Sequence, residues 1–165
     1  MRLPPLHRVI GACLAVSALV LLALPASAAS LSRSMDVDGT PSAVWSAIGP
    51  FCAIRDWHPA IATCAEDGKS PSTRTLVTKD GKATFVELNI SEAHAKNQYS
   101  YTFVSSPLPV THYRSTLKVT ASRNGSKVTW SGDYTPDNGK EKDADQALAG
   151  IYETGLQAIK AKFAK

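Results

Sequence analysis

The chain has 165 residues, of which 44% are hydrophobic and 19% charged, and its formal net charge is +4. This length suits one domain with a sizeable core, and it leaves little room for a second domain. Because acidic and basic residues are intermixed, with no basic run and no interleaving of basic with aromatic residues, we expect no nucleic-acid partner.

The N-terminus has the pattern of a secretory signal peptide. Arg2 and Arg8 precede an apolar run over residues 9–24, and small residues follow at the positions that a signal peptidase reads. We therefore predict a cleaved signal peptide over residues 1–28 and a single domain over residues 29–165. The mature protein would be periplasmic or secreted, with no stable membrane insertion after cleavage. An uncleaved anchor is the alternative.

Two of the three cysteines would remain after cleavage. Cys13 lies within the apolar run, whereas Cys52 and Cys64 would reach an oxidising compartment. A redox pair would more usually have the Cys-x-x-Cys spacing, and a metal site would need further ligands nearby. We expect a structural disulfide between Cys52 and Cys64.

The first part of the mature chain reads as one strand and two short helices. Residues 31–37 can form the strand. Thr40 and Pro41 then supply an N-cap and a proline at the first helical position, which predicts a short helix. One or two further helical turns are expected over residues 51–57, before Pro59 interrupts them.

Six further strands follow. They are expected at residues 61–66, 73–79, 83–90, 99–104, 110–121 and 126–134. The dipeptides Asp80-Gly81 and Asn124-Gly125 are typical of tight turns and predict antiparallel hairpins. In the third of these strands we expect the face that carries Val86, Leu88 and Ile90 to be buried.

The segment over residues 140–165 is an amphipathic helix. Its apolar residues recur at steps of three and four: Leu148, Ile151, Tyr152, Gly155, Leu156, Ile159 and Phe163. Such a stripe must be buried, and the predicted sheet is its only large partner. Small residues such as Gly155 on this side indicate either a cavity beneath the helix or close packing of helix on sheet.

The expected fold class is therefore α+β. Seven antiparallel strands would curve around the long C-terminal helix, with two short helices between the first and second strands. Strand alternation and the helical stripe direct one set of side chains into the interior: Tyr101, Phe103, Tyr113, Ser115, Trp130, Ile151 and Gly155. These residues are the candidate ligand site, in which hydroxyl groups could orient a polar group of a ligand. Alternatively, they are ordinary core residues.

This order of elements resembles the SRPBCC superfamily of helix-grip ligand-binding proteins, which includes the birch-pollen allergen, lipid-transfer domains and polyketide cyclases. Residues 40–45, which open the first helix, share in this resemblance. Residues 44–46, 57–64 and 112–115 are most similar to the branch that holds plant abscisic-acid receptors and small exported bacterial proteins. One of those bacterial groups accompanies periplasmic methanol-oxidation systems. The resemblance implies a cavity for a small hydrophobic or amphipathic molecule, and it makes a periplasmic oxidoreductase a candidate partner.

The same resemblance draws attention to His58. The lysine that pairs with the hormone carboxylate in the receptors falls at His58, and their strand glutamate falls at Val86 or Glu87. The implied pocket thus has the receptors' shape with different contents. His58 would lie near its mouth, where it could bind an acidic group or move a proton. Alternatively, it hydrogen-bonds the short helix ahead of Pro59.

The sequence has no nucleophile motif, and His58, His94 and His112 lack the spacing of metal ligands. We therefore expect no metal and no cofactor, and surface positions for His94 and His112. The favoured function is non-catalytic binding of a small apolar molecule. One alternative is a cyclase- or dehydratase-like enzyme with His58 as its base. The other is an accessory protein that docks on a periplasmic dehydrogenase.

Overall fold

The computed structural model describes residues 27–164. The expected signal peptide over residues 1–28 therefore lies outside the described residues, apart from Ser27 and Ala28. No helix within residues 27–164 has both the length and the apolar character needed to cross a membrane.

The described chain contains the expected strands and helices. The strands are β1 (Ala29–Val37), β2 (Ile61–Glu66), β3 (Thr73–Thr78), β4 (Thr84–Ala93), β5 (Gln98–Ser105), β6 (Val110–Ser122) and β7 (Gly125–Pro136). The helices are α1 (Pro41–Ile48), α2 (Ile54–Trp57) and α3 (Glu141–Phe163), and the short turns η1 (Phe51–Ala53) and η2 (His94–Lys96) are 3₁₀-helical. The predicted fold class is confirmed, including the two short helices between β1 and β2.

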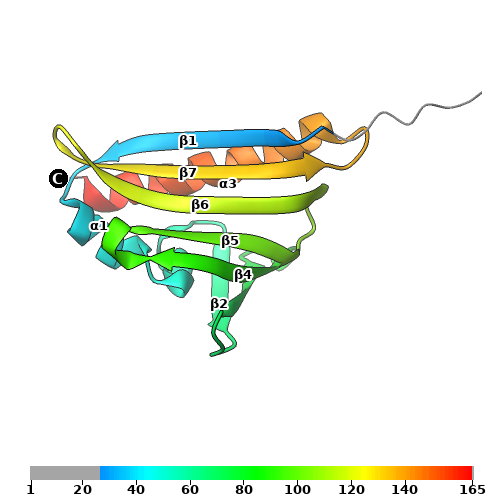
Figure 1. The fold of residues 1–165 in the computed structure, drawn as a ribbon, viewed down its shortest axis with the longest axis horizontal. Coiled ribbons are helices and arrows are strands. Elements are labelled where there is room, and N and C mark those ends of the chain that lie inside the picture. Colours follow the sequence, from blue (N-terminus) through cyan, green and yellow to red (C-terminus); the bar gives the residue numbers. More distant parts are fainter. Residues whose placement is uncertain (1–26, 165) are drawn as a thin grey trace, which may run out of the picture.

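The strands form one antiparallel sheet in the order β1-β7-β6-β5-β4-β3-β2. Strands β2 to β7 follow one another as neighbours, while β1 pairs with β7 in a register that begins with Ala29 opposite Tyr134. Figure 1 shows β1, β7 and β6 side by side, with α3 running behind them. The shorter strands curve away toward β2, and the short helices lie at the end of the sheet near the C-terminus.

Local sequence signals account for where the elements begin and turn. Thr40 caps α1, since its hydroxyl oxygen accepts a hydrogen bond from the Ala43 backbone N–H at 3.3 Å. The turns between β3 and β4 and between β6 and β7 place Gly81 and Gly125 at φ of 69° and 149°, where glycine is favoured.

The buried face of β4 is the opposite of the one expected. Val86 and Leu88 are only half-buried and Ile90 is exposed, whereas Glu87 and Asn89 are 4% and 5% exposed. Hydrophobicity alone gives the wrong answer here because Arg74, on the neighbouring strand, is directly opposite Glu87 in the register. The two opposite charges compensate each other, so the polar face of β4 can be buried.

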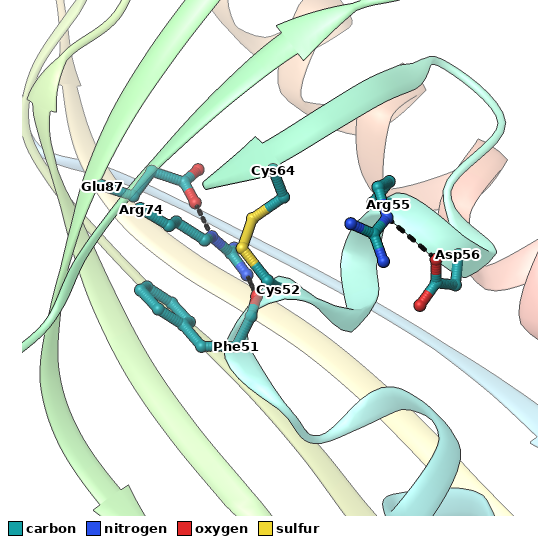
Figure 2. Close-up of a disulfide and its surroundings, with 7 residues drawn as sticks. All are labelled: Phe51, Cys52, Arg55, Asp56, Cys64, Arg74 and Glu87. Atoms are coloured by element: carbon teal, nitrogen blue, oxygen red, sulfur yellow. Dashed lines mark hydrogen bonds and ion pairs between the residues drawn. A yellow bond between two sulfur atoms is a disulfide. The ribbon is translucent and has the colours of Figure 1, made fainter. Parts of the chain in front are cut away.

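The predicted disulfide is present between Cys52 in η1 and Cys64 in β2, with Cα atoms 5.5 Å apart. Figure 2 shows it beside the Arg74–Glu87 pair, which lies on the same side of the sheet. The bond therefore ties the segment that follows α1 to the edge strand.

Candidate functional site

A cavity of about 230 Å³ lies between the sheet, α2 and α3. Its walls consist almost wholly of carbon atoms. The lining residues are Ile54, His58, Ala60, Ile61, Leu76, Thr78, Phe85, Glu87, Tyr101, Phe103, Tyr113, Trp130, Leu148 and Ile151. Ala60 is exposed and also borders a surface hollow with Thr78 and Lys79, so the cavity reaches the surface beside the β3–β4 turn.

The structure brings most of the predicted site residues together around this cavity. His58, Tyr101, Phe103, Tyr113, Trp130 and Ile151 line it. Ser115 and Gly155 do not: the Ser115 hydroxyl is bonded to Tyr152 and Ser131, and Gly155 is covered by aromatic rings. The part that these residues play in ligand binding stays a prediction.

A chain of hydrogen bonds fixes the polar ends of the aromatic rings. The hydroxyl oxygens of Tyr101 and Tyr113 are 3.3 Å apart, and that of Tyr113 lies 2.8 Å from that of Tyr152. Tyr152 also contacts the Ser115 hydroxyl at 3.0 Å. The indole N–H of Trp130 donates to both Tyr101 and Ser115, each at 3.0 Å. The rings are therefore held by the protein itself.

The hydrogen bonds among these hydroxyl groups all run in one direction, because each hydroxyl has a single proton to donate. The Ser115 hydroxyl donates to the Ser131 carbonyl at 2.8 Å, so the contact between Ser115 and Tyr152 needs the proton of Tyr152. By the same reasoning Tyr113 donates to Tyr152, and Tyr101 donates to Tyr113. Every hydroxyl proton in the chain is thus engaged, and only acceptor capacity is left over.

The phenols keep these protons at neutral pH. Burial raises the pKa of Tyr101 and of Tyr113 well above the ordinary value, and it raises the pKa of Tyr152 to about 12. The sequence indicated Tyr101 and Tyr113, but Tyr152 stood out only as an apolar member of the helical stripe. Its hydroxyl finds space because Gly132 on β7 has no side chain, and a Cβ atom there would lie 2.4 Å from it.

His58 is buried, at 3% exposed, with both ring nitrogens occupied. Nδ1 accepts a hydrogen bond from the Ala60 backbone N–H at 3.2 Å, which leaves Nε2 to donate to the Ile151 carbonyl at 3.0 Å. Burial lowers the pKa of His58, and the bond to Ile151 opposes that shift only in part. The His58 side chain is therefore neutral and joins the end of α2 to α3, whereas the alternative interpretation predicts that it bonds the short helix itself.

Gly155 allows this contact between His58 and α3 to form. A Cβ atom at Gly155 would lie 2.8 Å from the rings of both His58 and Trp130 and 3.0 Å from that of Trp57. The small residue on the helix thus permits close packing of rings at this position, while the cavity lies nearer the N-terminal end of α3, beside Leu148 and Ile151.

The Arg74–Glu87 pair lies at one wall of the cavity, and the sequence did not reveal it. Nε of Arg74 is 2.6 Å from the Glu87 carboxylate, and Arg74 also donates to the Phe51 carbonyl (Figure 2). The guanidinium lies 4.0 Å from the centre of the Phe51 ring. Burial raises the pKa of Glu87 and the Arg74 charge opposes that rise.

No group of three or more histidine, cysteine, aspartate or glutamate residues within the described range could hold a metal ion. His112 is exposed on the outward face of β6, as expected. Nothing is described of the His94 side chain, so its expected surface position stays a prediction.

A curved sheet that holds one long helix over an apolar cavity defines the helix-grip class of ligand-binding proteins. A comparison with known families identifies the family within this class. Residues 28–164 match the family described as polyketide cyclase/dehydrase and lipid transport. The chain therefore belongs to this family of the SRPBCC superfamily, as the sequence resemblance predicted. No curated protein matches the chain.

Solved structures give the same result. XoxI from Bacillus cereus is 33% identical, with a TM-score of 0.77 over 82% of this chain and 95% of XoxI. A protein from Bacillus thuringiensis is also 33% identical and has the same TM-score, over 82% of this chain and 98% of that one. The ZhuI aromatase/cyclase from Streptomyces sp. R1128 is 12% identical, with a TM-score of 0.66 over 82% of this chain and 93% of ZhuI, and shares the fold alone.

Proposed function

We propose that this protein is an exported, non-catalytic carrier or sensor of a small apolar or amphipathic molecule held between the sheet and α3. The observation that carries the proposal is the cavity itself. Hydrogen bonds among Trp130, Tyr101, Tyr113 and Tyr152 hold the aromatic walls in position, so the rings resist collapse into the space. An apolar cavity held open in this way gains free energy when an apolar ligand fills it.

The experiment starts from mature protein, residues 29–165, stripped of bound molecules and then incubated with extract of the producing cells. Mass spectrometry of the repurified protein under native conditions, followed by denaturation, identifies what is retained. We expect one compound or a narrow class at one equivalent per chain. Failure to retain any molecule would refute the proposal, whereas stable capture of a dehydrogenase in its place would favour the docking alternative.

The geometry also weighs against the enzyme alternative in the form that uses His58. A general base must have a nitrogen lone pair within reach of the substrate. In His58 the only lone pair, on Nδ1, already accepts the Ala60 N–H, and Nε2–H is held by Ile151. A His58→Gln variant that lost turnover of an aromatic polyketide while keeping its fold would support the enzyme instead.

Export is the second part of the proposal, and it is supported by two features. The Cys52–Cys64 disulfide is consistent with an extracytoplasmic location. The sheet begins at Ala29, directly after the expected cleavage site, so a mature chain would keep every strand. Fractionation of the producing cells with intact-mass measurement should find a chain that starts at Ala29 outside the cytoplasm. An intact N-terminus in the cytoplasmic fraction would contradict export.

A further inference from the structure

The side chains that line the cavity in the described part of the chain have no free hydrogen-bond donor. Besides the phenols and Trp130, the lining residues with donor groups are His58 and Thr78. His58 donates to Ile151, and the Thr78 hydroxyl lies 2.6 Å from the Asp80 carboxylate that accepts its proton. A ligand oxygen that needs a donor would therefore be left without one, which is costly in a buried site.

Within residues 27–164, no cationic side chain lines the cavity. Glu87 lines the cavity, whereas its partner Arg74 is fully buried behind it and is not part of the lining. The described residues that line the cavity include no lysine and no arginine, and Lys79 borders only the surface hollow at its mouth. A carboxylate or phosphate ligand inside the cavity would lie near the Glu87 carboxylate with no cation in the lining, so its own charge would be desolvated without compensation.

The volume also limits the ligand. An apolar cavity of about 150 Å³ is known to bind benzene, and pockets for drug-sized molecules start at about 300 Å³. At about 230 Å³ this cavity lies between the two and suits one or two fused rings. A long acyl chain or a system of four fused rings would require it to expand.

We propose that the ligand is a compact, uncharged molecule of one or two rings, whose polar group, if it has one, is a hydrogen-bond donor such as a hydroxyl. The spare lone pairs of Tyr101 and Tyr113 would accept from that donor. The inference rests on the proposed function and narrows it, since it excludes carboxylates, phosphates and long-chain lipids as the bound species.

The first test compares naphthalene, naphthol, naphthoate and pyrene by titration calorimetry with mature protein. We expect naphthalene and naphthol to bind with similar affinity, naphthoate to bind at least about a hundredfold more weakly, and pyrene to show no binding. Ile151→Trp, which fills the cavity, should abolish binding of naphthol. The matched Ile90→Trp, on the outward face of β4 away from the lining, should not affect it.

The second test makes a hydrogen-bond donor available at the cavity wall. In Tyr113→Phe the Tyr101 hydroxyl loses its acceptor, so its proton becomes available to a ligand. Naphthonitrile, an uncharged acceptor, should then gain about three- to tenfold in affinity relative to naphthalene. Tyr101→Phe removes that hydroxyl altogether and should give no gain. The gain in the first variant and its absence in the second are expected only if the protons are arranged as described.

The outcomes separate the two proposals. If naphthoate binds as tightly as naphthol, or if pyrene binds as well as naphthalene, the inference about the ligand is overturned while a binding function stands. If none of the probes binds and nothing is retained from cell extract, the proposed function fails as well. An equal response of Tyr113→Phe and Tyr101→Phe to naphthonitrile would also overturn the inference.

Discussion

Gly150 and Gly155 lie in the same helix but have different surroundings. A Cβ atom at Gly150 would meet no other atom within 4 Å, whereas one at Gly155 would press against the rings of His58, Trp130 and Trp57. Intrinsic helix propensity favours alanine at both positions, so the two sites separate the effect of propensity from that of packing. At Gly155 the clash with rigid rings should outweigh the gain in helix propensity.

We therefore predict opposite effects for the same substitution. Gly155→Ala should lower the free energy of unfolding by about 1–3 kcal/mol through overpacking. Gly150→Ala should raise it by about 0.5–1 kcal/mol. Urea unfolding of the two variants beside the wild type measures both. A stabilised Gly155→Ala protein would mean that the rings can retreat into the cavity, contrary to the close packing described here.

His58 should make the protein sensitive to mild acid. Because burial lowers its pKa in the folded state, the unfolded chain binds a proton below about pH 6.5 that the folded chain does not. The free energy of unfolding should then fall as the pH drops from about 6.5 toward 5, by up to about 1.4 kcal/mol per unit.

Urea unfolding at several pH values measures this slope. In His58→Gln the slope should largely disappear, while His112→Gln, at an exposed position on β6, should keep it. A slope that persists in His58→Gln would show that another group is responsible.

At the scale of elements, the Cys52–Cys64 bond holds η1 against the edge strand β2. The loop that this disulfide closes is short. Loss of the disulfide should therefore lower the free energy of unfolding by about 3 kcal/mol, mainly through the greater freedom of the unfolded chain. We expect this loss in the Cys52→Ser/Cys64→Ser protein and in reduced wild type, measured by chemical unfolding. If reduction left the wild-type midpoint unchanged, the bond would not be formed in the purified protein.

The Arg74–Glu87 pair joins β3 to β4 and, through the Phe51 carbonyl, to η1. Removal of one partner would leave a buried charge uncompensated, so Arg74→Met should cost about 3–5 kcal/mol. The double variant Arg74→Met/Glu87→Leu should recover most of this. The exposed pair Arg33–Glu153 has the same separation of 2.6 Å, and there Arg33→Met should cost less than about 1 kcal/mol.

Thermal and urea unfolding of these variants measures the contrast between the two pairs. Equal costs for Arg74→Met and Arg33→Met would contradict the buried geometry.

At the scale of the whole molecule, the chain of phenols spans the interior from β5 and β6 to α3, so its ionisation should affect global stability. Tyr152 has a pKa of about 12 in the folded protein, above the ordinary value near 10 of an unfolded chain. The unfolded state loses its proton first, and stability should fall as the pH rises from about 10 to 12. Tyr152 alone should account for about 1.4 kcal/mol at pH 11.

Denaturant titrations at pH 8 and pH 11 test this, with Tyr152→Phe as the comparison. The variant should lose less stability between the two pH values than the wild type does. An identical loss would mean that the phenol is already accessible to solvent in the folded state.

Local patterns in the sequence determined most of the fold. The alternation in β5, β6 and β7, the Asp80-Gly81 and Asn124-Gly125 turns, and the helical stripe of α3 depend only on neighbouring residues. The inward positions of Tyr101, Tyr113 and Trp130 follow directly from that alternation. For the same reason the helix-grip architecture and the candidate cavity could be predicted before any contact was known.

Only the tertiary structure decided which polar groups satisfy one another. The inward face of β4 depends on Arg74 of the adjacent strand, and the role of Tyr152 depends on Ser115 and Tyr113 across the cavity wall. His58 changed from a candidate base to a neutral link because Ile151, far along the chain, accepts its proton. The free energy of a buried polar group is set by the partner it finds, and residues distant in sequence supply those partners only once the chain has folded.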